Sequence, residues 1–236
     1  MIKEFAFGTS NRHHFQDADA VSNWQGIDSD TFVSLYDYDD YVKKYFAEHK
    51  SLSGFDGLIY IPDEFILDID GSDSLRARDK AYRLLNMLGD MKIPTKTYFS
   101  GTGFHIGIPS SAFRWKPSKD LHLKVKDMLT KAGIFEYADP SVTDKTRIIR
   151  VVNTRNNKSG LWKVEIGHKD VDAIFCCDDE DFLSGIEDYA KGPRDITTIN
   201  LECEPIFDVL ERTKRDSKQV EEVEVINRGR VPDPIN

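Results

Sequence analysis

The sequence predicts an α+β fold in which strands outnumber helices and form antiparallel or mixed sheets. Extended runs rich in Val, Ile, Phe and Tyr recur along the chain, and short turns containing Gly or Asn separate several of them, as is typical of hairpins. Only a few stretches place apolar residues at the spacing of a helix. At 236 residues, with 39% hydrophobic and 31% charged side chains, the chain has the composition of a globular protein with a sizeable core.

Seven segments are expected to be strands, because β-branched or aromatic residues fill them and turn-forming residues bound them. The segment at 58–61 continues past Pro62 into the next one. A turn with two glycines, Gly101 and Gly103, joins two others as a hairpin. The expected strands cover 32–36, 58–61, 65–70, 95–99, 104–108, 147–152 and 161–166.

Two long helices are predicted by apolar residues that recur every three or four positions. The first follows Asp73, a good N-cap residue, and ends between Gly89 and Pro94; the second ends at Gly133. Short helices are expected at 41–46 and 206–212. The apolar positions are Ala77, Ala81, Leu84, Leu85 and Leu88 in the first long helix and Leu121, Val125, Leu129 and Ala132 in the second.

Composition limits the compartment and the partners. No apolar run approaches the roughly 18 residues of a membrane span, and the N-terminus lacks a signal-peptide core. Three cysteines, two of them adjacent, give neither a disulfide framework nor a zinc-ligand spacing, so we expect a cytoplasmic protein and no membrane partner. The formal charge of −9 argues against indiscriminate coating of nucleic acid. Residues 145–169, however, hold seven basic side chains and one acidic, a local charge of +6 that suits an anion site.

The expected strand at 65–70 carries two aspartates on one face. Because side chains alternate along a strand, Asp68 and Asp70 share a face with Ile66, and they lie about 6.6 Å apart along the strand axis. Both carboxylates can turn towards one or two hard cations, which take oxygen ligands. The pattern alone is equally typical of a strand that ends in a solvated acidic turn.

Two further segments carry groups suited to phosphate chemistry. The hairpin Ser-Gly-Thr-Gly-Phe-His-Ile delivers His105 on the face opposite its apolar residues. Asp139 stands at the head of the basic stretch that holds Arg147, Arg150 and Lys158, and such cations can bind a polyphosphate beside metal-bound carboxylates. Arg147 and Arg150 are three residues apart, so either Arg147 precedes the strand or only one of them reaches the site. The alternative for this stretch is a hairpin with exposed basic residues.

Taken together, these motifs resemble the three motifs of the archaeo-eukaryotic primase superfamily, and in particular its primase–polymerase type from mobile elements. The intervals of 35 residues from Asp70 to His105 and 34 residues from His105 to Asp139 suit that family. The resemblance covers about 58–166. It implies a core sheet like that of RNA-recognition domains and a second subdomain that together form a catalytic cleft. It departs from the family at Gly103, where many members carry serine, and in lacking cysteines for a zinc-binding insertion.

The resemblance also implies roles for individual residues. Asp68, Asp70 and Asp139 would be the catalytic carboxylates that bind Mg²⁺ or Mn²⁺. Contacts to the phosphates of the incoming nucleotide would come from His105, Arg147 and Arg150, with Lys158 as an addition to this set.

The expected function is therefore template-directed nucleotidyl transfer to a 3′-hydroxyl by two-metal catalysis, as in a DNA primase or polymerase. Residues 1–213 would form the primase–polymerase catalytic domain and 214–236 a flexible charged tail. Partners would be a single-stranded DNA template and primer, nucleoside triphosphates, and a helicase or other replication protein bound through the C-terminal region. Two alternatives stay open: a metal-dependent nuclease or phosphodiesterase, and an inactive single-strand-binding component of a replication or defence complex.

Overall fold

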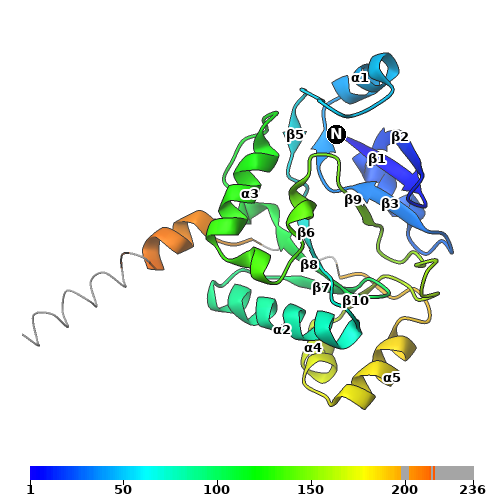
Figure 1. Cartoon of the computed structure of the whole chain (residues 1–236), viewed down its shortest axis with the longest axis vertical. Coiled ribbons are helices and arrows are strands. Elements are labelled where there is room, and N and C mark those ends of the chain that lie inside the picture. The colour runs from blue at the N-terminus through cyan, green and yellow to red at the C-terminus, as the bar shows by residue number, and fades with distance from the viewer. Residues whose placement is uncertain (198–201, 214, 216–236) are drawn as a thin grey trace, which may run out of the picture.

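The α+β class is confirmed by the computed structural model, which describes residues 1–197, 202–213 and 215. The chain forms two antiparallel sheets, and helices cover one side of the second sheet (Figure 1). The expected tail at 214–236 lies outside the described residues, apart from Arg215. No helix in the described ranges is long and apolar enough to cross a membrane.

The first sheet, called sheet A here, is built mainly from the N-terminal part of the chain. Its strand order is β5-β4-β1-β3-β9, and β2 pairs with β1 as a further strand; every pairing is antiparallel. The strands at 2–7, 11–17 and 37–38 were not predicted from the sequence. The strands are β1 (Ile2–Phe7), β2 (Asn11–Asp17), β3 (Thr31–Ser34), β4 (Asp37–Tyr38), β5 (Ile59–Tyr60) and β9 (Ile148–Arg150).

The second sheet, sheet B, has four antiparallel strands in the order β10-β7-β8-β6. The expected hairpin is present, since β7 and β8 pair on either side of the turn at 100–103. The expected continuity past Pro62 is wrong, because β5 belongs to sheet A and β6 to sheet B. The strands are β6 (Glu64–Ile69), β7 (Lys96–Phe99), β8 (Phe104–Pro109) and β10 (Val164–Ile166).

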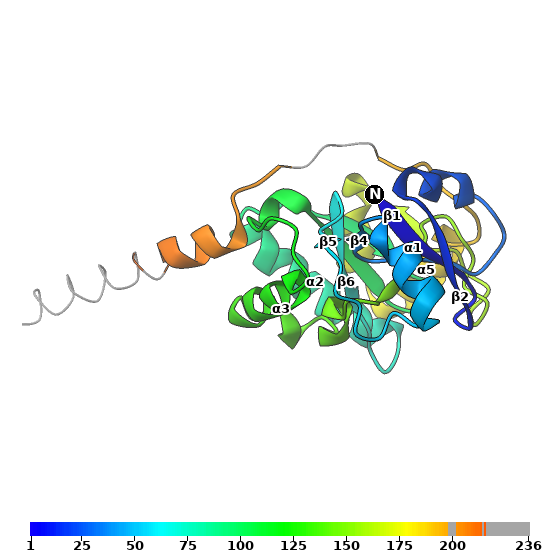
Figure 2. The same cartoon turned by 90° about the horizontal axis from the view of Figure 1, so that it is seen from above.

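Both long helices form where the sequence predicts them, and the shorter helix at 41–46 extends to His49. Two helices after sheet B, at 168–175 and 179–189, were not predicted. A further helix spans 206–213 and projects beside α3 in both orientations (Figures 1 and 2). The α-helices are α1 (Tyr41–His49), α2 (Ser74–Asp90), α3 (Leu121–Lys131), α4 (His168–Phe175) and α5 (Asp179–Tyr189). The 3₁₀ helices are η1 (Ala18–Trp24), η2 (Ser110–Ala112), η3 (Ile134–Glu136) and η4 (Pro140–Thr143).

Sheet B is buried on both faces, and the two faces differ in chemistry. Its apolar face packs against the helices: Phe104 contacts Phe175 of α4 and Phe182 of α5, with ring centroids 5.0 and 6.3 Å apart. The polar face is turned towards sheet A, and a cavity of about 300 Å³ lies between the two sheets. The apolar face comprises Phe65, Leu67, Ile69, Thr97, Phe99, Phe104, Ile106, Ile108, Val164 and Ile166; the polar face comprises Glu64, Ile66, Asp68, Tyr98, His105 and Glu165.

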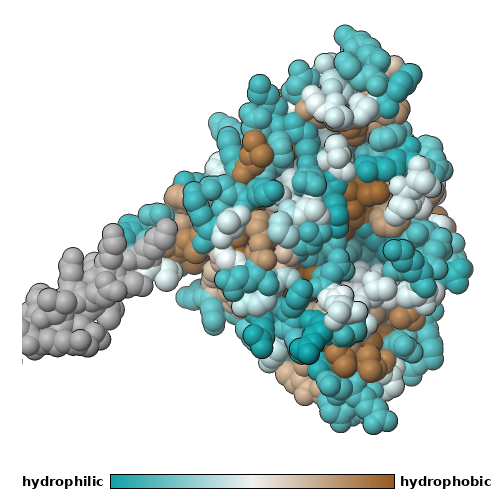
Figure 3. Space-filling model, viewed as in Figure 1, coloured by the Kyte–Doolittle hydropathy of each residue, from teal (hydrophilic) through white to brown (hydrophobic). Residues whose placement is uncertain are grey.

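The face of the molecule seen in Figure 3 is largely hydrophilic. In the view of Figure 3 the hydrophobic residues form separate small patches among polar ones. This distribution agrees with the 31% of charged residues in the sequence. Further polar groups are buried inside the molecule, on the face of sheet B that is turned towards sheet A.

Candidate metal centre

Two aspartates lie at the carboxyl end of β6. Asp68 is inside the strand and only 8% exposed, whereas Asp70 directly follows the strand and is exposed. Asp68 is on the polar face, as the alternation predicts, because Phe65, Leu67 and Ile69 occupy the apolar one. Apolar packing on one face thus fixes the direction of the carboxylate on the other.

Asp139 reaches the same place from the loop before η4. Its backbone N–H donates a hydrogen bond of 2.8 Å to the carbonyl of Asp68, which ties the loop to β6. Its carboxylate accepts hydrogen bonds from the backbone N–H and the hydroxyl of Ser141, so it also caps η4. The carboxylate oxygens of Asp68, Asp70 and Asp139 lie within 4.8 Å of one another.

His105 contacts the cluster across the strand pair. It lies directly opposite Asp68 in the β6–β8 register, and its Nε2 is 3.3 Å from Asp68 Oδ1. It pairs with Asp68 and Tyr98 on the polar face and is 4% exposed, so the prediction that it leaves the apolar stripe is confirmed. Burial, followed by the positive charge of Lys163, lowers the pKa of His105. A neutral imidazole with its proton on Nε2 therefore donates to Asp68 near pH 7.

Arg147 bridges two of the carboxylates. Its Nη2 is 2.7 Å from Asp68 Oδ2 and 3.4 Å from Asp139 Oδ2, while Nη1 donates to the Ser141 hydroxyl at 2.9 Å. Arg147 precedes β9, which begins at Ile148, so the expected conflict with strand alternation does not arise. Its side chain is 29% exposed, so it is only partly shielded from solvent.

The charges of the cluster act on one another. Burial would raise the pKa of Asp68, but the hydrogen bond from His105, the charge that this ring carries once it is protonated at low pH, and the charge of Arg147 outweigh it and lower that pKa to about 2. The pKa of Asp70 is raised instead, first by burial and then by the negative charges of Asp68 and Asp139. Asp68 is therefore held as a carboxylate, and Asp70 gains most from a nearby positive charge.

The three carboxylates fit a hard divalent cation. Oxygens that share such an ion at about 2.0–2.6 Å lie up to about 5 Å apart, which agrees with the observed limit of 4.8 Å. The mutual repulsion that raises the pKa of Asp70 would be relieved by a cation. The donors are all carboxylate oxygens, the type that Mg²⁺ and Mn²⁺ prefer. In the described structure Arg147 supplies the positive charge between them.

Two other predicted residues lie away from the carboxylates. Arg150, at the end of β9, forms an ion pair with Asp30 and lies over the ring of Phe32, 4.5 Å from its centroid. Within the described contacts it does not reach the three aspartates. Lys158 is exposed on a turn at 156–160, whose Asn156 side chain donates to the carbonyl of Ser100. That turn lies against the β7–β8 hairpin, so Lys158 is near the hairpin that carries His105.

Gly103, the departure from the family pattern, has a clear packing reason. A Cβ atom there would lie 2.6 Å from the carbonyl oxygen of Ile69 and 3.3 Å from Asp70 Oδ1. Any side chain would push the hairpin away from the end of β6. The glycine thus allows the hairpin to close on the segment that carries Asp70.

Three groups of this region were missed in the sequence. Ser141 is a hydrogen-bond partner of both Asp139 and Arg147, and its position two residues after Asp139 was the available signal. Lys163 is buried behind His105, although it belongs to the basic stretch that was noted. Burial lowers its pKa to about 8. The third is Glu64, which accepts from the hydroxyl of Tyr98 at 2.9 Å.

No family model matches the chain, and no curated protein or solved structure matches it either.

Proposed function

We propose that this protein is a template-directed nucleotidyltransferase, a DNA primase or polymerase that adds nucleotides to a 3′-hydroxyl. The observation that carries the proposal is the convergence of Asp68, Asp70 and Asp139 with a histidine and an arginine in one cluster. Hydrolytic metal sites need the carboxylates, but a triphosphate substrate also needs cations at their edge. Arg147 provides such a cation, in contact with Asp68 and Asp139.

The finer architecture is part of the same proposal. We infer a primase–polymerase core in which sheet B is the RNA-recognition-like sheet and sheet A the second subdomain. Support comes from the cavity between them, which is lined by charged residues from both sheets, among them Lys3, Glu64, Arg150 and Lys163. The carboxylates lie at one end of β6 and Glu64 at the other, so the polar face links the cavity to the proposed metal centre.

Each residue has a defined part in the proposed reaction. Asp68, Asp70 and Asp139 would hold two Mg²⁺ or Mn²⁺ ions, which lower the pKa of the attacking 3′-hydroxyl and offset negative charge on the phosphates. Arg147 would exchange a carboxylate for a phosphate oxygen and orient the triphosphate. His105 holds Asp68 in place through Nε2 and would donate to a phosphate oxygen only by giving up that contact. Lys158 would reach the phosphates from its exposed turn, and Arg150 would do so only by leaving Asp30.

The proposed partners follow from this activity. They are a single-stranded DNA template with a primer, nucleoside triphosphates, and a helicase or other replication protein that docks on the C-terminal region. A cytoplasmic location would suit such partners.

The test is incorporation by the purified full chain. Primed and unprimed single-stranded templates are incubated with ribo- or deoxynucleoside triphosphates and either Mg²⁺ or Mn²⁺. We expect products longer than the primer from the natural sequence and none from Asp68→Asn. Asp90→Asn, an exposed aspartate at the end of α2, is the matched control and should extend primers normally. Shortened primers would support the nuclease, and binding of the template without any change in length would support the inactive alternative.

A further inference from the structure

The segment that carries Arg147 is held by sheet A through its backbone carbonyls. The Lys145 carbonyl accepts from the hydroxyl of Tyr38 at 2.9 Å, and the Arg147 carbonyl accepts from the backbone N–H of Leu35 at 2.8 Å. Between them, the Thr146 carbonyl accepts from Nη2 of Arg12 at 2.9 Å. Three consecutive carbonyls are therefore bound by donors from sheet A and its β3–β4 loop.

Arg12 is itself fixed by a buried carboxylate. Its Nε and Nη2 donate to the two oxygens of Glu4 at 2.9 and 3.0 Å, and the Glu4 side chain is fully buried. The backbone N–H of His13 also donates to Glu4, at 3.1 Å. A two-point contact between a guanidinium and a carboxylate fixes the plane of the guanidinium, so it leaves little freedom to the Nη2 that reaches Thr146.

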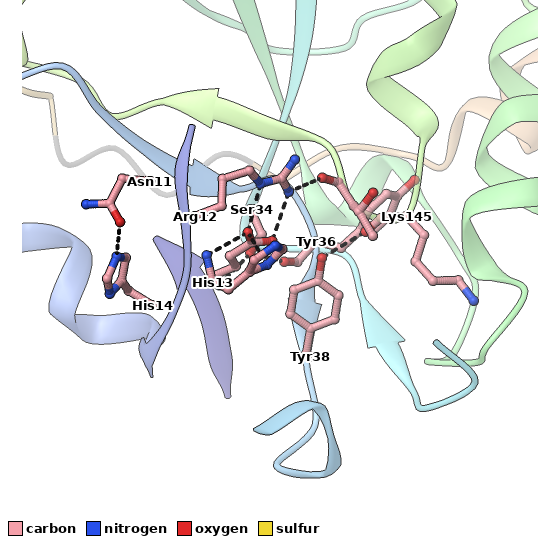
Figure 4. A network of polar contacts seen from close by, with 10 residues as sticks. Asn11, Arg12, His13, His14, Ser34, Tyr36, Tyr38 and Lys145 are labelled. Atoms are coloured by element: carbon pink, nitrogen blue, oxygen red, sulfur yellow. Dashed lines mark hydrogen bonds and ion pairs between the residues drawn. The ribbon is translucent and has the colours of Figure 1, made fainter. Parts of the chain in front are cut away.

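A β-bulge points Arg12 in this direction. In the β1–β2 pairing Phe5 lies opposite His14 and Phe7 opposite Asn11, so Arg12 and His13 together face the single residue Ala6. His13 has a φ of 71°, in the left-handed region that non-glycine residues seldom adopt. Bulges of this kind redirect a side chain from its regular place on the strand. Figure 4 shows Arg12 and Tyr38 directed towards the chain at Lys145.

We propose that Arg12, held by Glu4, is a positioning residue for Arg147. The chain of contacts runs from buried Glu4 through Arg12 to the Thr146 carbonyl, and Arg147 follows directly with its guanidinium on Asp68 and Asp139. Sheet A thereby sets where the guanidinium of Arg147 lies relative to the carboxylates. The role in catalysis rests on the proposed function, but the effect on the cluster itself does not.

Cation binding tests the proposal without any need for activity. Arg147 and a divalent ion compete for the same oxygens, Asp68 Oδ2 and Asp139 Oδ2, so Arg147→Ala should tighten Mn²⁺ binding by about tenfold. Arg12→Lys keeps a positive charge for Glu4, but one ammonium group cannot reproduce both the two-point contact and the bond to Thr146. Arg12→Lys should therefore weaken the contacts of the Arg147 guanidinium with Asp68 and Asp139. Because Arg147 then competes less well for these oxygens, Mn²⁺ binding should tighten by about two- to fivefold. Titration calorimetry or the paramagnetic resonance of Mn²⁺ measures both.

A double-variant cycle separates positioning from general stability. If Arg12 acts through Arg147, Arg12→Lys should change Mn²⁺ affinity in the natural background and leave it unchanged in the Arg147→Ala background. Arg114→Lys is the matched control, because Arg114 also pairs with a carboxylate, that of Asp208, but far along the chain from this segment. An equal effect of Arg12→Lys in both backgrounds, or no effect in either, would overturn the proposal.

A second variant covers the case in which Arg12→Lys does not fold. Tyr38→Phe removes only the hydroxyl that binds the Lys145 carbonyl and keeps the packing of the ring against Phe55. It should act in the same direction as Arg12→Lys, more weakly, and also only when Arg147 is present. An unchanged Mn²⁺ affinity in Tyr38→Phe as well would contradict the proposal. Failure of the natural sequence to extend primers, with the Mn²⁺ cycle as expected, would overturn the proposed function and leave the positioning role intact.

Discussion

The apolar face and the polar face of sheet B are made by alternate residues of the same four strands, yet they meet different surroundings. Phe65, Leu67 and Ile69 of β6 are fully buried, and the apolar face packs on helices. On the other face, Asp68, His105, Tyr98 and Glu165 lie side by side in one row across all four strands. Both faces are buried, so burial alone does not distinguish them.

The difference lies in how each face compensates its burial. Apolar side chains gain free energy when they leave water, at about 25 cal/mol per Å² of apolar surface. Charged groups lose solvation, and they stay ionised only where partners replace water. On the polar face His105 and Arg147 replace water as partners of Asp68, which stays ionised. For Lys163 and Glu64 burial is the stronger effect: it lowers the pKa of Lys163 and raises that of Glu64. One face stabilises the fold, and the other holds groups whose charge is set by their neighbours.

The largest expected effect of a change on the polar face is on the reaction. Asp68→Asn should reduce nucleotide incorporation by about 10³-fold or more, because it removes a charged ligand from the proposed metal centre. Its effect on the free energy of unfolding should stay near 2 kcal/mol, since a pKa of about 2 in place of 3.8 corresponds to that amount above pH 4. That stabilisation is lost as the pH falls from about 4 to about 2. Near-normal turnover of this variant at saturating Mn²⁺ would show that Asp68 is not a ligand of the proposed metal centre.

A change on the apolar face should show the reverse pattern. Phe104→Ala deletes a ring packed between Phe99, Phe175 and Phe182, so it should lower the free energy of unfolding by about 3–5 kcal/mol. Activity per folded molecule, measured well below the melting temperature, should stay within about twofold of normal. A loss of activity as large as that of Asp68→Asn, in protein that is still folded, would show that the two faces are not separate in function.

Arg150, in β9, and Arg147, which directly precedes that strand, allow a second comparison. Arg147→Ala should raise the apparent KM for triphosphate by about 10- to 100-fold, because its guanidinium lies on the carboxylates, and should lower the free energy of unfolding by less than about 2 kcal/mol, because Asp68 keeps His105 as a partner. Arg150→Ala should instead lower the free energy of unfolding by about 1–3 kcal/mol, because it leaves Asp30 without its partner. Steady-state kinetics and thermal melts on both variants separate these outcomes. Equal effects on KM would mean that Arg150 reaches the nucleotide after all.

The elements that the sequence predicted are those in which a local period decides the structure. Alternation placed Asp68 opposite the apolar residues of β6, and it placed His105 off the apolar stripe of β8; both are confirmed. Helical spacing located α2 and α3 for the same reason. In these segments one face must be buried, and the spacing of the apolar residues in the sequence shows which face it is.

The parts that could not be predicted depend on contacts between distant segments. The bulge in β2 breaks the alternation of that strand, so its pattern gave no signal for a strand. The bond from Arg12 to Thr146 joins residues 134 positions apart, and the Arg150–Asp30 pair exists only because β3 and β9 are neighbours. Such pairings require the sheet order, which no local period contains.

The smallest expected effect concerns the electrostatic link across the polar face. Burial is the first cause of the lowered pKa of His105, and the charge of Lys163 is the second. Lys163→Met removes the charge and keeps much of the side-chain volume, so the pKa of His105 should rise while staying below the ordinary value of about 6.5.

Imidazole resonances followed by NMR from pH 4 to 8 measure that pKa. Lys96→Met is the matched control, because Lys96 also lies on sheet B but acts on Glu64, and it should leave the titration of His105 in place. The sign follows from charge alone: a cation nearby disfavours the protonated ring, so its removal favours protonation. An unchanged or lower pKa in Lys163→Met would mean that burial alone keeps His105 neutral, and that the polar face holds separate groups rather than a coupled row.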